Sequence, residues 1–275
     1  MKRNSVRFVM TIGLAAAALS IAATASANLY SNAGGYGSSA IGLSTGSTAA
    51  NGAAAPAGFE WSELQSEGGF TNNTLGFGAG GGTAPAGTRL ADDFTVNAAG
   101  GWSITSISLF GYVTNSAAGT NPYSTVTLRI WNGRPGDAGS SVIFGDLSNL
   151  IAQTTVTDTN IYRIGGSAPG TLRLVRQLSI DLTGLTLGQG TYWLDFSTSG
   201  GFVPAITAPG LRGGGVNGNA VQQLAGVWSG IVDAGEPGSG APAIAQDIPF
   251  NINGIPAPGA LALLGVAGLV GRRRR

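Results

Sequence analysis

Val126-Thr-Leu-Arg-Ile-Trp131 decides the fold class of this chain. Val126, Leu128 and Ile130 alternate with polar or aromatic residues, the period-two pattern of a strand that buries one face. Asn132-Gly-Arg-Pro-Gly-Asp137 follows at once and is dense in residues that favour turns. The stretch therefore predicts a strand that ends in a tight loop.

The same alternation recurs on both sides of this stretch. Short strands separated by Gly, Pro and Asn turns, with no amphipathic helix between them, are typical of an all-β fold. We expect an antiparallel β-sandwich of jelly-roll type over residues 88–254. The predicted strands are 89–96, 101–113 with a bend or bulge, 126–131, 178–182, 192–196 and 248–252.

The N-terminal end has the three parts of a secretory leader. Lys2, Arg3 and Arg7 form a basic start, residues 8–23 are mostly apolar, and Ala25-Ser26-Ala27 fits an A-x-A cleavage site. Residues 1–27 are therefore predicted to form a signal helix that signal peptidase removes. An uncleaved membrane anchor is the alternative.

The C-terminal end, residues 255–275, also has three parts. Pro256-Ala257-Pro258 precedes 13 uncharged residues, and Arg272, Arg273, Arg274 and Arg275 follow. A helix of that length measures about 20 Å, shorter than the roughly 30 Å hydrocarbon core of a bilayer. The arginines favour the cytoplasmic side. We expect a short hydrophobic helix that inserts transiently into the inner membrane. The alternative is an apolar core helix with a solvated tail.

This end resembles the PEP-CTERM sorting signal, which is also labelled the ice-binding protein C-terminal domain. Pro256-Ala257-Pro258 stands where the family has Pro-Glu-Pro, so the sequence departs from the motif at Ala257. The resemblance implies an exosortase-type protease as partner, removal of the tail, and release or attachment at the cell surface. The body resembles uncharacterised secreted proteins that carry this signal, through residues 90–96, 101–107, 128–136 and 190–195.

Charge and composition exclude several function classes. Seven of the 14 basic residues lie in the two end segments, so the part between them has seven basic against 13 acidic residues, a net charge of about −6. An acidic body without lysine argues against nucleic-acid binding. The chain has no Cys and no His, which excludes thiolate nucleophiles, Cys/His zinc sites and His-dependent triads.

Residues 28–87 are rich in Gly, Ala and Ser and bury little apolar surface. We expect an N-terminal arm with loops here, with residues 59–64 as a candidate helical turn.

Carboxylates are the remaining groups for catalysis or metal binding. Asp92 and Asp93 are adjacent, so in a strand they point to opposite faces and form a poor catalytic pair. Either is a candidate ligand for calcium, the one cofactor considered. The alternative is that one of them hydrogen-bonds to backbone at a sheet corner.

Trp131 and Trp193 lie on the phase opposite to the apolar residues of their strands. An exposed face would make them a platform for stacking glycans, and a covered face would make them core.

These features together predict an exported protein of the cell surface or extracellular space. We expect a structural or binding role rather than catalysis, with extracellular polysaccharide as a candidate partner. The alternative is a carboxylate-dependent glycan hydrolase or lyase.

Overall fold

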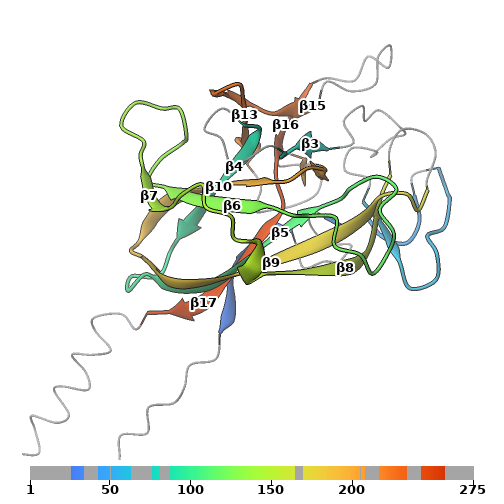
Figure 1. Ribbon diagram of the computed structural model, residues 1–275, viewed down its shortest axis with the longest axis horizontal. Helices are drawn as coiled ribbons and strands as arrows, with labels where there is room; N and C mark the ends of the chain where they lie inside the picture. Colours follow the sequence, from blue (N-terminus) through green and yellow to red (C-terminus); the bar gives the residue numbers. More distant parts are fainter. Residues whose placement is uncertain are drawn as a thin grey trace, which may run out of the picture.

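The chain folds into stacked β-sheets (Figure 1). The computed structural model describes residues 26–33, 43–49, 51–62, 76–80, 87–164, 170–204, 206–207, 217–233 and 243–257. Within these residues the one helical element is a single 3₁₀ turn, Ile151–Gln153. The all-β prediction is confirmed.

Two six-stranded sheets make up the body. In spatial order, sheet I contains β1 (Ala27–Ser31), β17 (Phe250–Pro256), β5 (Trp102–Gly111), β9 (Leu174–Leu187), β8 (Thr154–Arg163) and β2 (Glu60–Ser62). In the same order, sheet II contains β14 (Val227–Gly230), β13 (Val221–Leu224), β4 (Arg89–Val96), β10 (Gly190–Thr198), β6 (Val126–Trp131) and β7 (Val142–Gly145).

Smaller sheets lie beside these two. β3 (Phe77–Gly78) pairs with β11 (Phe202–Val203). β16 (Ile244–Asp247) pairs with both β12 (Ile206–Thr207) and β15 (Val232–Asp233).

The core lies between the two six-stranded sheets, as the alternation predicts. Sheet I contributes residues such as Ile107 and Ile180, and sheet II contributes residues such as Leu128 and Phe196, all at most 1% exposed. Full burial of each such side chain stabilises the fold by roughly 1.5–3 kcal/mol. Phe94 and Trp102 stack within this core at 6.3 Å between ring centroids.

Two arms of the chain, β4–β5 and β9–β10, pass between sheet II and sheet I side by side. β4 continues into β5 while β9 continues into β10, with β10 paired to β4 and β9 paired to β5. The register places Val96 opposite Gly190 and Trp102 opposite Leu187, on either side of the corner. Both arms thus turn the corner side by side.

Most predicted strands are confirmed, and their differences from the structure have physical causes. Strands 89–96 and 126–131 have the predicted bounds, and register shifts near Ile104 confirm the bulge predicted in 101–113. β9 is longer than 178–182 because it pairs with β8 from Leu174 onward and with β5 as far as Leu187. The last strand begins at Phe250, since Ile248 lies in the preceding loop.

Two segments within residues 27–87 form edge strands of sheet I. β1 pairs antiparallel with β17, and β2 pairs in parallel with β8. The helical turn considered for 59–64 is wrong over its described part, because Glu60–Ser62 is extended and bonded to β8. The parallel pair is a departure from the purely antiparallel prediction.

Among the described residues, no helix has the length and apolar character needed to cross a membrane. The predicted signal helix up to Ala25, Pro258, the hydrophobic C-terminal segment and Arg272, Arg273, Arg274 and Arg275 lie outside the described residues.

Candidate functional site

Trp131 and Trp193 are direct cross-strand neighbours on the outer face of sheet II. They lie on β6 and β10, and each has its side chain on the face opposite to the core residues of its strand. Alternation in the two strands places them on the same face, and the pairing register brings them together. The sequence therefore predicts their shared face but not their contact.

Asp195, two residues after Trp193, is the charged centre of this face. Its carboxylate is fully buried and accepts hydrogen bonds from Arg89 Nε at 2.6 Å, Arg129 Nε at 2.7 Å and Trp131 Nε1 at 2.9 Å. Burial lowers the pKa of Arg89, and the neighbouring Asp195 opposes that shift. Asp195 therefore fixes the positions of the arginines and of the Trp131 indole, and its own oxygens have donors.

Trp193 is covered by the loop that follows β6. The Arg134 guanidinium lies 5.9 Å from the Trp193 ring centroid, and Trp193 is only 6% exposed. A buried indole offers no open face to a sugar ring, so Trp193 supports the surface instead of forming it. Trp131 remains partly exposed, although Arg129 lies 5.1 Å from its ring centroid.

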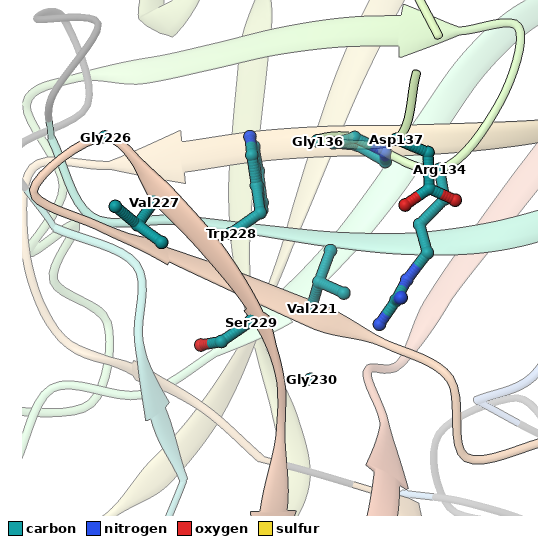
Figure 2. A pocket seen from close by; sticks show the side chains of 10 residues that line it. Arg134, Gly136, Asp137, Val221, Gly226, Val227, Trp228, Ser229 and Gly230 are labelled. Carbon is teal, nitrogen blue, oxygen red and sulfur yellow. The ribbon is translucent and has the colours of Figure 1, made fainter. Parts of the chain in front are cut away.

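A groove of about 380 Å³ opens where this loop meets the β13–β14 hairpin. The loop contributes residues 134–137, and the hairpin contributes Val221 and residues 226–230 (Figure 2). Gly136 lies against Trp228, since a side chain at Gly136 would come within 3.1 Å of the Trp228 Cβ. Close contact between loop and hairpin thus shapes one end of the groove.

Three kinds of group line this groove. Trp228 is partly exposed and supplies an aromatic surface, Arg134 supplies a cation, and Asp137 supplies an exposed carboxylate. Figure 2 shows Trp228 and Arg134 on either side of Val221. An aromatic surface beside a few polar groups is the usual composition of a small-ligand site.

Asp92 and Asp93 point to opposite faces, as expected of neighbours in a strand. Asp92 faces inward at 1% exposed, and it accepts hydrogen bonds from Ile248 N at 3.0 Å and from Asn32 Nδ2 at 3.4 Å. Asp93 faces outward and accepts a hydrogen bond from Asn217 Nδ2 at 2.9 Å. Asp92 thus makes the backbone hydrogen bond of the alternative role, but it does so in the middle of β4 and not at a sheet corner.

Asp247 is the carboxylate near Asp92, and it is also buried. It accepts hydrogen bonds from Asn217 N at 2.6 Å and Asn219 N at 2.9 Å. Burial first, and then the charge of Asp247, raise the pKa of Asp92 well above its usual value. Burial also raises the pKa of Asp247.

No group of three or more acidic side chains able to hold a metal ion occurs within the described residues. Calcium at Asp92 or Asp93 stays a prediction.

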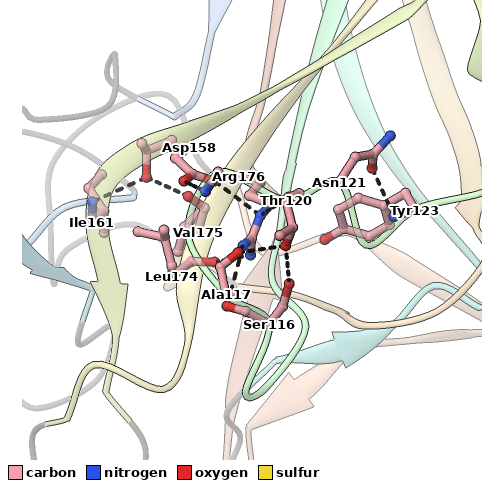
Figure 3. A network of polar contacts seen from close by, with 12 residues as sticks. Ser116, Ala117, Thr120, Asn121, Tyr123, Asp158, Ile161, Leu174, Val175 and Arg176 are labelled. Carbon is pink, nitrogen blue, oxygen red and sulfur yellow. Dashed lines mark hydrogen bonds and ion pairs between the residues drawn. The ribbon is translucent and has the colours of Figure 1, made fainter.

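Arg176 organises the loop between β5 and β6 on the other sheet (Figure 3). Its buried guanidinium donates to the carbonyl oxygens of Ala117 at 2.7 Å, Thr120 at 3.2 Å and Ser116 at 3.4 Å. Its Nε also lies 3.1 Å from an Asp158 carboxylate oxygen. The network holds a loop in place and leaves no opening for a ligand at Arg176.

The predicted sorting and cleavage residues that the structure describes lie on neighbouring strands. Pro256 ends β17 opposite Trp102, and Ala257 N donates to Gly101 O at 2.9 Å. Ala27 begins β1 opposite Gly254 of β17.

Arg134 and Asp195 are the site residues that sequence reasoning missed. The signal for Arg134 is its place inside the turn-rich Asn132–Asp137 stretch that follows Trp131. That stretch indicates a loop but not the direction in which the loop folds back. No family model, curated protein or solved structure matches this chain.

Proposed function

We propose that this protein is an exported β-sandwich of jelly-roll type with a binding or structural role rather than a catalytic one. It acts at the cell surface or in the extracellular matrix. Its groove between the 132–141 loop and the β13–β14 hairpin holds polysaccharide. The observation that carries the binding role is the groove itself, in which Trp228 and Arg134 flank Val221.

The chemistry of the groove suits a sugar better than an apolar ligand. Carbohydrate rings present C–H faces that pack on an indole, and hydroxyl groups that accept hydrogen bonds from a guanidinium. Val221 is buried at the base of the groove, and Ser229 and Gly230 are exposed along one wall. A shallow site of this kind fits one or two residues of a longer chain.

The jelly-roll assignment is supported by the order in which strands alternate between sheets. β4 lies in sheet II, β5 in sheet I, the β6–β7 pair in sheet II and the β8–β9 pair in sheet I, and the β9–β10 arm returns along β5 and β4. Jelly rolls likewise fold their strands into two packed sheets joined by Greek-key connections.

Export and sorting are supported by residues at the two ends of the chain. The predicted leader with Ala25 and Ala27, and the tail with Pro256, Ala257, Pro258 and the four arginines, fit signal peptidase and an exosortase-type protease. The test compares the mass and location of the native protein with those of a variant lacking residues 255–275. We expect loss of the tail and a surface or matrix location. An intact tail in the inner membrane would contradict sorting.

Polysaccharide binding is tested with the folded protein and extracellular polysaccharide by affinity electrophoresis. Trp228→Ala removes the aromatic wall, and we expect it to weaken binding by about tenfold or more. Leu224→Ala is the matched control, because Leu224 is exposed on the same hairpin but does not line the groove. Equal binding by both variants would contradict the proposed site.

A further inference from the structure

Arg134 is a cation without an anionic partner within the described part of the chain. The ion pairs found there join Arg89 and Arg129 to Asp195, and Arg176 to Asp158. The Arg134 Nε is buried and has no hydrogen-bond partner among the same residues. Because Nε is buried, a ligand in the groove would reach the outer nitrogens of the guanidinium, of which Nη2 lies beside Gly230.

The described surroundings of Arg134 do not supply a carboxylate partner. Asp195, the fully buried carboxylate of the outer face, already receives Arg89, Arg129 and Trp131. Asp137 lines the groove as well, yet no ion pair between described residues joins it to Arg134. The guanidinium is instead held from one side by the ring of Trp193.

The groove leaves space beside the guanidinium. Arg134 runs past Val221 toward Gly230 (Figure 2), and a side chain added at Gly230 would come within 3.7 Å of Arg134 Nη2. Because residue 230 is glycine, that volume is open to a ligand. A sugar lying there would have Trp228 on its other side.

We infer that the groove selects a sugar that carries a carboxylate, of the uronic acid class, and binds that carboxylate on Arg134. This inference rests on the proposed polysaccharide-binding function. A guanidinium pairs with a carboxylate through two parallel hydrogen bonds, which a neutral sugar does not offer.

The charge of the site favours a single carboxylate over a phosphate or a run of sulfates. One guanidinium matches one negative charge. Any further negative charge on the ligand is repelled by Asp137 and by the acidic body, which has 13 acidic against seven basic residues between the end segments. The glycan is therefore one in which uronate residues are spaced by neutral sugars.

The test uses glucuronate-containing oligosaccharides prepared from gellan, and the same oligosaccharides after reduction of their carboxyl groups to alcohols. Binding is measured by calorimetry with the full-length protein, with Arg134→Gln, with Arg134→Lys and with the Leu224→Ala control. We expect the acidic form to bind at least about tenfold more tightly than the reduced form. Arg134→Gln removes that preference, Arg134→Lys retains part of it, and Leu224→Ala retains it in full.

The outcomes separate this inference from the proposed function. Equal binding of the two oligosaccharides would overturn the inference and leave the glycan groove standing. A preference for the acidic form that survives in Arg134→Gln would also overturn it, because a residue other than Arg134 would then bind the carboxylate. Absence of binding by both forms would overturn the groove and the inference together. Thermal midpoints of the variants establish that each has folded.

Discussion

Asp92 is a buried carboxylate in a strand that otherwise faces the core with apolar residues. Its hydrogen bonds to Ile248 N and Asn32 Nδ2 link β4 to the loop before β17 and to the end of β1. Burial, and next the charge of Asp247, raise its pKa, so its protonated form is the one the folded state favours. Asp92 thus connects three parts of the sandwich, and the free energy that its burial costs depends on pH.

We predict that the protein loses stability as pH rises from the usual aspartate pKa, near 4, through the raised pKa of Asp92. Over that window the folded state binds more protons than the unfolded state, so the free energy of unfolding falls with pH. The slope is on the order of 1 kcal/mol per pH unit. Urea unfolding from about pH 4 to about pH 8 measures it.

Asp92→Asn is the matched variant for that experiment. It keeps an acceptor for Ile248 N and removes the charge, so its unfolding free energy should vary less with pH. An unchanged slope in Asp92→Asn would show that other groups cause the dependence.

Arg176 shows the opposite case, a buried cation whose guanidinium is surrounded by acceptors. We predict that Arg176→Met destabilises the protein by roughly 1–3 kcal/mol, because it leaves several loop carbonyls without a donor. The exposed Asp158 keeps the hydrogen bond from Gly119 N at 2.6 Å. Arg134→Gln is the control, since Arg134 has no ion pair among the described residues, and it should change stability by less than about 1 kcal/mol. Chemical denaturation compares the two. Similar losses in both variants would contradict the assigned role of Arg176.

At the scale of elements, the corner between β4 and β5 depends on one residue. Gly101 has φ +82°, and a Cβ there would lie 2.2 Å from Leu187 O on the neighbouring arm. Gly184 also has a positive φ, +77°, but nothing lies within 4 Å of its added Cβ. The two glycines separate the effect of backbone strain from that of close strand packing.

We predict that Gly184→Ala costs about 1 kcal/mol and that Gly101→Ala costs several kcal/mol more. The first value is the usual penalty for an L-residue with positive φ, and the second adds a steric clash that the paired arms cannot relieve. Thermal unfolding of both variants gives the comparison. A similar cost at both positions would mean that the corner relaxes.

The edge pair β1–β17 has a consequence for the proposed export. Ala27 and Asn28, which flank the predicted leader cleavage site, are paired with Gly254 and Asn253. Tyr30 anchors the strand by packing on Phe250 at 5.1 Å between ring centroids. A protease needs an extended strand free of its partner, so the folded sheet protects this bond.

We therefore predict that signal peptidase cuts the folded, unprocessed protein slowly. Tyr30→Ala loosens β1 and should speed cleavage at Ala27 by about tenfold, measured by gel analysis of timed digests. A Leu224→Ala protein, altered on a distant edge, should be cut as slowly as the parent. Rapid cleavage of the parent would show that β1 does not protect the site.

The strands of the core could be predicted, because their alternation is local. Val126 to Trp131 has the same bounds in sequence and structure. β1 and β2 could not be predicted, since short edge strands rich in small or polar residues carry little alternation. The proximity of Asp92 to Asp247 depends on β16 and β17, far along the chain, so local pattern does not contain it.

At the scale of the whole molecule, the two faces of sheet II have different roles. Its inner face packs on sheet I, and its outer face holds buried charges around Asp195 beneath a loop and a hairpin. The sequence predicts that Trp131 and Trp193 share the outer face. It does not predict that the 132–141 loop returns over Trp193, because that conformation depends on contact between Gly136 and Trp228. The groove is therefore a product of tertiary structure.

The most direct test of the proposed groove is where a glycan binds, observed through the tryptophans themselves. The chain has five tryptophans, so ¹⁵N-tryptophan labelling gives five indole N–H signals, each assigned by substitution. During titration with a glucuronate-containing oligosaccharide, we expect the Trp228 signal to shift most. The signals of Trp61 and Trp102, which are buried away from the groove, should stay in place. Binding that moves Trp61 or Trp102 and leaves Trp228 unchanged would contradict the groove as the functional site.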